Sequence, residues 1–219
     1  EIKNPLTPIQ LASDRLLKKY RPDDQKAADQ FEEYVSIIMR QVDDIGRMVD
    51  EFSAFARMPQ PEMDRQSLLE IVNGQISLFA SKDLLLDVEI DDASQDYTTI
   101  CDAGLVRQAL TNLLQNARDS LQEHHVVAPA ICISMTSEDD MIAITLTDNG
   151  PGFPKMDLGK LLEPYITTRQ KGTGLGLAIV SKIMEDHGGN MQLGKADGGG
   201  ALVCLKFPIH KTTRNGKII

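Results

Sequence analysis

The chain has 219 residues, 42% of them hydrophobic, and a formal net charge of −9, which allows one large domain or two small ones with a real core. The acidic balance argues against nucleic acid as a partner, because nucleic acid selects a basic face. No run approaches the ~18 apolar residues that cross a bilayer, and no signal-peptide pattern opens the chain. We expect a cytoplasmic piece without membrane contact, cut from something longer because it opens directly on a helical pattern.

Few residues suggest metal or redox chemistry. The three cysteines, Cys101, Cys132 and Cys204, stand singly in apolar runs without metal-ligand spacing, and buried free thiols are expected. His187, placed before two glycines, fits the C-terminus of a helix, where a positive charge is favoured.

The first part of the chain has the pattern of two helices. Apolar residues recur at helical spacing over residues 1–20, and over residues 26–57 their steps alternate between four and three, which is a heptad seam. Neither helix can bury its stripe against the other alone. The pattern therefore predicts an antiparallel hairpin that forms a four-helix bundle with a second copy of the chain. A plain dimerisation hairpin explains most of these residues, but not the polar group Glu1, Lys3 and Asn4.

A proline-rich break separates the hairpin from a second domain. We predict a hairpin domain over residues 1–58, a linker over 59–66, and an α/β domain over 67–219. Helices are expected at 67–80, 103–121 and 175–187, and strands at 84–90, 98–101, 130–136, 141–147, 190–193 and 201–207. The last four strands form two hairpins, which favours a mixed sheet covered on one face by helices, and an α+β class for the whole chain.

Two glycine clusters predict a nucleotide pocket with a lid. Asp148-Asn149-Gly150-Pro151-Gly152 ends a strand, and Gly172-Thr173-Gly174-Leu175-Gly176-Leu177 begins a helix whose bare N–H groups would attract a phosphate. The dinucleotide fingerprint and the phosphate-binding loop of G-x-x-x-x-G-K-[ST] type both fail on spacing. Taken alone, such a cluster is more often a turn.

Polar residues near the glycines add candidate ligands. Asn112 and Asn116 stand one turn apart on a helix, where asparagine is costly unless it binds something, and an amide oxygen suits Mg²⁺. Asp148 can accept a hydrogen bond from the exocyclic amine of adenine. In the irregular segment between the clusters, Arg169 and Lys171 offer charge for a γ-phosphate, and Glu163-Pro164-Tyr165 can seat the flap. Exposed asparagines and a solvated loop are the alternatives.

These segments resemble the ordered motifs of sensor histidine kinases. The segments 112–117, 148–152 and 172–177 are similar to the N, G1 and G2 boxes, Glu163-Pro164-Tyr165 to the F box, and residues 1–6 to the H box just after its phosphoacceptor histidine. The segments 5–10 and 52–59 are most similar to nitrogen-regulation sensors of the NtrY type.

The resemblance implies a Bergerat-type ATP fold, Mg²⁺-dependent phosphorylation of a helix histidine, and transfer to a response regulator receiver domain. It implies that Asn116 binds Mg²⁺, that Glu1 is the acid/base partner of the histidine, and that Asn4 orients water for dephosphorylation of the regulator. The ATP-binding set that it implies is Asn112, Asn116, Asp148, Gly150, Gly152, Tyr165, Arg169, Lys171, Gly172, Thr173, Gly174, Leu175, Gly176 and Leu177. It also implies a parent anchored in the bacterial inner membrane.

Two departures from the family pattern bear on activity. The chain starts one residue after the expected phosphoacceptor, and none of His124, His125, His187 and His210 stands in for it, so we expect a piece that binds ATP but lacks that histidine. Asp119 stands where many of these kinases have a basic residue. The alternatives are a water-attacking ATPase of the gyrase, Hsp90 and MutL superfamily, which would need a glutamate base where Asn112 stands, and a nucleotide-gated docking module without catalysis.

Overall fold

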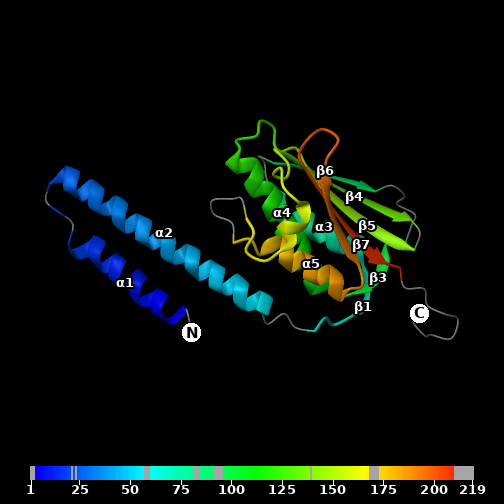
Figure 1. Ribbon diagram of the computed structural model, residues 1–219, viewed down its shortest axis with the longest axis horizontal. Coiled ribbons are helices and arrows are strands. Elements are labelled where there is room, and N and C mark those ends of the chain that lie inside the picture. Colours follow the sequence, from blue (N-terminus) through cyan, green and yellow to red (C-terminus); the bar gives the residue numbers. More distant parts are fainter. Residues whose placement is uncertain are drawn as a thin grey trace. The chain divides into compact units, whose positions relative to one another are not determined.

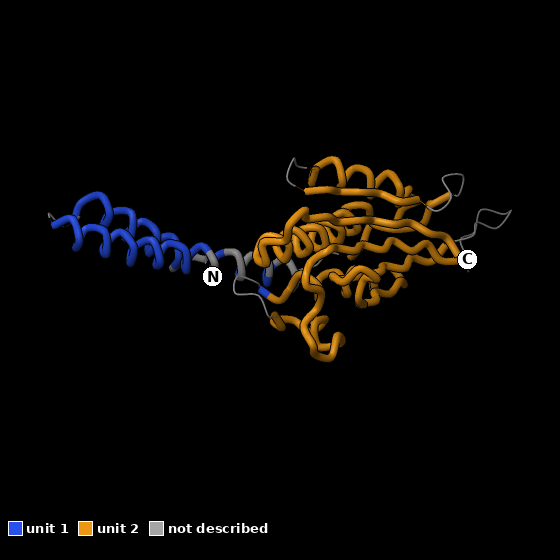
Figure 2. Tube along the Cα trace, turned by 90° about the horizontal axis from the view of Figure 1, so that it is seen from above, with its two compact units in different colours: residues 1–58, 169–173 blue, residues 59–168, 174–219 orange. Residues whose placement is uncertain are grey.

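The chain folds as two compact units in a computed structural model that describes residues 3–20, 22, 24–56, 60–80, 84–90, 96–138, 140–167 and 173–209. The first unit is built on residues 1–58, and the second on residues 59–168 and 174–219 (Figure 2). The boundary falls at the proline-rich break. Among the described residues no helix combines the length and the apolar character needed to cross a membrane.

The first unit is a hairpin of helices α1 (Lys3–Lys19) and α2 (Gln25–Ala56), which lie side by side (Figure 1). Asp24 starts α2, because its carboxylate accepts a hydrogen bond of 2.9 Å from the backbone N–H of Ala27. Ala28, Val35 and Val42 are buried between the helices. Large apolar side chains nevertheless stay exposed on the single hairpin: Ile9, Leu11, Leu16, Tyr20, Tyr34, Ile37, Ile38, Ile45 and Phe52. The predicted hairpin is confirmed, and much of its apolar stripe is exposed among the described residues.

The second unit is a five-stranded mixed sheet in the order β2-β4-β5-β7-β6. Its strands are β2 (Leu85–Ile90), β4 (Ala130–Glu138), β5 (Met141–Asp148), β6 (Asn190–Lys195) and β7 (Ala201–Pro208). Only β2 and β4 pair in parallel, and the other neighbours are antiparallel. Helices α3 (Leu68–Phe79), α4 (Ala103–Glu123) and α5 (Gly176–Asp186) cover one face (Figure 1). This two-layer arrangement confirms the predicted fold class.

The core lies between the sheet and the helices. Residues alternate between buried and half-buried along β4 and β5, as a strand with one face against helices requires. The largest fully buried side chains are Leu68, Leu110, Leu114, Leu121, Ile131, Ile133, Met135, Ile142, Ile144, Leu175, Ile183 and Phe207. They come from all three helices and three strands, so this core fixes α4 and α5 against the sheet.

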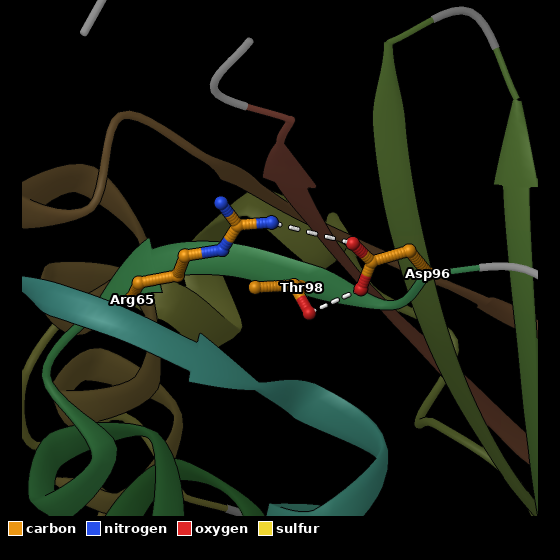
Figure 3. A network of polar contacts seen from close by, with 3 residues as sticks. All are labelled: Arg65, Asp96 and Thr98. Carbon is orange, nitrogen blue, oxygen red and sulfur yellow. Dashed lines mark hydrogen bonds and ion pairs between the residues drawn. The ribbon is translucent and has the colours of Figure 1, made fainter. Parts of the chain in front are cut away.

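A second, two-stranded sheet lies where the sequence predicts the end of a linker. Strand β1 (Asp64–Ser67) pairs antiparallel with β3 (Thr98–Cys101). An ion pair of 3.4 Å joins Arg65 to Asp96, which also accepts a hydrogen bond from the Thr98 hydroxyl (Figure 3). Both charged side chains are more than 60% exposed (66% and 69%), so the pair adds little stability. Ser67 then caps α3 by accepting from the N–H of Glu70.

Candidate nucleotide-binding site

The carboxylate of Asp148 lies at the end of β5, beside the start of β7. It is 8% exposed, and its Oδ1 accepts hydrogen bonds from the N–H of Gly150 at 2.8 Å and of Ala201 at 3.2 Å. The register that pairs Thr147 with Leu202 brings these strand ends together. Two backbone donors therefore hold one oxygen of a nearly buried carboxylate in a fixed direction.

Glycines let the backbone close in around this carboxylate. A Cβ on Gly150 would lie 2.9 Å from Asp148 Oδ1, 3.4 Å from Leu121 and 3.6 Å from the Ser120 hydroxyl on α4. Gly152 has φ +78° and Gly200 has φ +79°. A Cβ on Gly200 would lie only 1.8 Å from the carbonyl oxygen of Asp148, so only glycine fits. Gly200 ends a run of three glycines in the turn between the last two predicted strands, and the sequence does not predict its contact with Asp148.

The two asparagines lie on α4 where it faces the start of α5. Both are partly buried. A Cβ on Gly176 would lie 3.3 Å from Asn116 Nδ2 and 3.7 Å from its Oδ1, so the amide of Asn116 lies against the first turn of α5. Asn112 Nδ2 is buried without a hydrogen-bond partner in the described part of the chain. An orphaned buried donor is costly in the free protein and fits an anionic ligand.

The turn that leads into α5 is held against the segment before it. The N–H of Tyr165 donates to the carbonyl of Gly174 at 3.0 Å. Gly174 has φ +71°, and a Cβ there would lie 2.6 Å from the carbonyl carbon of Tyr165, while Tyr165 itself has φ +69° and is exposed. Leu175 is 1% exposed and anchors the turn in the core. The short helix η1 (Leu158–Leu162), capped by Asp157, lies in the segment predicted to be irregular.

The predicted site residues thus divide into two groups. In the first group Asp148 is bonded to Gly150, which meets α4 one turn beyond Asn116, and Gly152 lies against Gly200. In the second group the turn from Gly174 to Leu177 brings Gly176 to Asn116. Thr173 precedes this turn in the chain. Glu1, Arg169, Lys171 and Gly172 lie outside the described residues, and Asn4 belongs to α1.

Arg118, the basic residue beside Asp119, contacts helix α3. The guanidinium of Arg118 lies 5.2 Å from the ring centroid of Phe79, the last residue of α3, and donates to Gln115 Oε1 at 2.8 Å. Gln115 in turn donates to Asp119. Arg118 is therefore committed to the α3–α4 contact and is no substitute for the family's basic residue.

His187 lies at a helix C-terminus, as the sequence predicts, because it is the C-cap of α5. The ring is 2% exposed, Nε2 accepts the N–H of Asp102 at 2.9 Å, and Nδ1 lies 2.7 Å from the carbonyl oxygen of Ile183. Since Nε2 accepts the N–H of Asp102, Nδ1 is the ring nitrogen that can donate to Ile183. The ring therefore links the end of α5 to the start of α4.

Known proteins match both units. Residues 101–211 match the family described as "Histidine kinase-, DNA gyrase B-, and HSP90-like ATPase", and residues 1–61 match the "His Kinase A (phospho-acceptor) domain". The chain is 44% identical to nitrogen regulation protein NtrY of Azorhizobium caulinodans over 94% of the chain and 27% of that protein. It is 39% identical to a putative NtrY-like sensor histidine kinase of Rickettsia bellii over 96% of the chain and 34% of that protein. The chain therefore spans about a third or less of these relatives.

Solved structures of histidine kinases share the fold of this chain. The catalytic domain of histidine kinase ThkA superposes with a TM-score of 0.59 at 28% identity, over 67% of this chain and 95% of that one. ThkA in complex with the response regulator TrrA superposes with a TM-score of 0.68 at 23% identity, over 95% of this chain and 58% of that one, which extends the shared fold to the hairpin. The chain belongs to the sensor histidine kinases and holds their helical hairpin and their ATPase domain.

Proposed function

We propose that the second unit binds Mg–ATP, and that in the whole protein this unit phosphorylates a histidine of the hairpin, which then phosphorylates a response regulator. The observation that carries the proposal is that α4 joins the two parts of the site. Its Asn116 lies against Gly176 at the glycine-rich start of α5, and one turn further on Ser120 and Leu121 lie beside Gly150, which donates to the fixed carboxylate of Asp148. The similarity to NtrY proteins supports a place in nitrogen regulation.

Adenine recognition falls to Asp148. A carboxylate is an acceptor only, so it selects the amino group of adenine over the carbonyl of guanine. Its Oδ1 is already engaged by Gly150 and Ala201, which fixes the direction in which the second oxygen is offered. Gly150 and Gly152 have no side chain, so a base can lie directly against the backbone there.

Phosphate and metal binding fall to α4 and α5. The unpaired Nδ2 of Asn112 is a donor for a phosphate oxygen, and the amide oxygen of Asn116 is a hard ligand for Mg²⁺. The N–H groups at the start of α5 add a partial positive charge. When bound, Mg²⁺ neutralises charge on the transferring phosphoryl group. The residues of α4 and α5 therefore fit both a phosphate chain and Mg²⁺.

Phosphoryl transfer needs positioning more than covalent chemistry. Arg169 and Lys171 supply charge near the γ-phosphate, Glu1 serves as acid/base partner of the histidine, and Asn4 orients water for dephosphorylation. Hydrolysis as the main activity is disfavoured, because the amide of Asn112 cannot take a proton from water. The exposed stripe on the hairpin is the surface for a second copy, which gives a four-helix bundle.

Nucleotide binding is tested by calorimetric titration with Mg–ATP. Asp148→Asn reverses the hydrogen-bonding character toward adenine at constant volume, and Asn116→Ala removes the metal ligand, so each is expected to weaken binding at least about tenfold. The matched controls are Asp186→Asn and Asn73→Ala, which lie outside the site. Unchanged affinity in both site variants would contradict the site.

Kinase chemistry is tested by adding one histidine directly before Glu1. With Mg–ATP this variant is expected to become an acid-labile phosphoprotein, while the same variant with Asp148→Asn stays unlabelled. Absence of labelling in a variant that still binds Mg–ATP would count against transfer to the hairpin.

A further inference from the structure

Helices α4 and α5, which carry the proposed phosphate site, touch at two separated places. At the start of α5, Gly176 lies against the amide of Asn116. At the other end His187, the C-cap of α5, reaches Asp102, the N-cap of α4. At 1.5 Å per residue the two contacts are about 21 Å apart along α4. Two such contacts define both the distance and the angle between the helices.

The contact at the far end depends on the chemistry of a histidine. Its Nε2 accepts the N–H of Asp102, its Nδ1–H donates to Ile183 in the last turn of α5, and its ring meets Phe207 edge-on at 6.2 Å between centroids. One ring nitrogen holds the histidine to its own helix, and the other reaches across to α4.

The other side of this contact is equally constrained. Asp102 Oδ1 accepts from the N–H of Gly104 at 2.8 Å and of Leu105 at 3.0 Å, which closes the first turn of α4. Oδ2 accepts from the N–H of Glu62 at 2.9 Å. The Asp102 backbone amide therefore cannot move without the first turn of α4, and a bond to this amide is a bond to the whole helix.

We propose that His187 is a positioning residue for the nucleotide site, which holds the end of α5 to the start of α4 and thereby sets the fit of Gly176 against Asn116. This inference rests on the proposed function, since it concerns the same two helices. The bond from Asp102 to His187 is directional, whereas the apolar packing between α4 and α5 is not. Sliding of α5 after loss of this bond would move the phosphate-binding turn away from Asn116.

Two substitutions separate positioning from mere packing. In His187→Gln the longer side chain carries an amide oxygen to the place of Nε2, where it accepts from Asp102. In His187→Asn the shorter amide reaches only the carbonyl of Ile183. Both variants are neutral and polar, and they differ in which of the two bonds survives. His124→Asn is the matched control, because His124 is the C-cap of α4 and its Nδ1 likewise lies 2.9 Å from the carbonyl oxygen four residues earlier, but the ring is exposed.

The experiment is a calorimetric titration of the full chain with Mg–AMPPNP, together with the backbone amide shift of Gly176 by NMR without nucleotide. We expect His187→Gln and His124→Asn to bind within about twofold of the wild type. His187→Asn is expected to raise the Kd about three- to tenfold, the effect of one lost hydrogen bond, and to shift the Gly176 amide.

Equal affinities of the glutamine and asparagine variants, with equal melting temperatures, would show that His187 only packs and would overturn the inference. A Gly176 amide that moves no more in His187→Asn than in His187→Gln would also overturn it. A wild-type chain that binds no Mg–AMPPNP would overturn the proposed function and this inference together, whereas the first two outcomes leave the proposed function standing.

Discussion

Asp102 shows how one residue joins three segments. Its side chain accepts from Glu62, Gly104 and Leu105, and its own N–H donates to His187. Burial raises the pKa of the Asp102 carboxyl, but the backbone N–H donors of Glu62, Leu105 and Gly104 outweigh it and leave the pKa below its usual value. The charged form is therefore the one that the fold selects.

Asp102→Ala is expected to lower the free energy of unfolding by about 1–2 kcal/mol, as for other lost N-caps. Because the folded pKa is depressed, the contribution of the charge is present above the unfolded value of about 3.9 and is lost as pH falls through the folded pKa. Denaturant unfolding at several pH values should show the gap between variant and wild type closing below about pH 4. Asp87→Ala, on an exposed strand position, is the control, and an equal loss there would contradict the capping role.

Cys101 is the least reactive type of thiol. It is fully buried, and burial, with the nearby Asp102 charge, raises the pKa of its thiol to about 11. Burial, with Glu89 and Asp87, also raises the pKa of Cys132. Since only the thiolate reacts, we expect Cys101 to resist a disulfide reagent at pH 8 until the domain unfolds, as followed site by site by mass spectrometry. Rapid labelling of Cys101 in the folded chain would contradict its placement in the core.

At the scale of elements, the turn between β6 and β7 does more than join two strands. Gly200→Ala is expected to destabilise the second unit by at least about 1–3 kcal/mol and to displace Asp148, because the added Cβ would collide with the Asp148 carbonyl at positive φ. Gly198→Ala is the matched control, since nothing lies within 4 Å of its added Cβ. Thermal unfolding and nucleotide titration of the two variants measure both effects. Equal melting temperatures and equal nucleotide affinities of the two variants would contradict a role of Gly200 in the site.

Periodicity predicted most elements because their burial repeats with the helix or strand. The heptads of α2 and the alternation of β5 are visible in the sequence, and the predicted ranges differ from the observed ones by a few residues. Strand β1 was not predicted, because its sequence Asp-Arg-Gln-Ser has no alternation of apolar residues. The strand forms by pairing with β3, which is thirty residues or more away in the sequence. Helix η1 is too short to show a period.

The candidate site divides in the same way. Asp148 and the glycines beside it could be predicted as site residues, because their residue types are unusual at the end of a strand. Gly200 and His187 could not, since their partners Asp148 and Asp102 are far away in sequence and are brought close only by the sheet and by helix packing. A run of glycines, or a histidine before two glycines, does not indicate in the sequence which distant residue it will contact in the fold.

At the scale of the whole molecule, the two units predict how the chain can be divided. A chain of residues 59–219 should fold, bind Mg–ATP and be monomeric by light scattering, while the full chain is expected to be a dimer through the hairpin stripe. A tightly dimeric 59–219 chain would place the dimer interface elsewhere.

A shorter cut tests the role of β1. A chain of residues 68–219 loses β1, the Ser67 cap of α3 and the Glu62 bond to Asp102. It should therefore unfold at a lower temperature than 59–219, although both contain the whole five-stranded sheet. Equal melting temperatures would mean that β1 is only a tether.

Strand β7 is the last of the described strands in chain order, yet it lies between β5 and β6 in the sheet. During synthesis β6 therefore emerges with no strand to pair with, and Asp148 lacks its bond to Ala201 until β7 docks. A nascent chain that has not yet made β7 therefore lacks one side of the proposed adenine site. We therefore expect a chain that is truncated before β7 to bind no ATP.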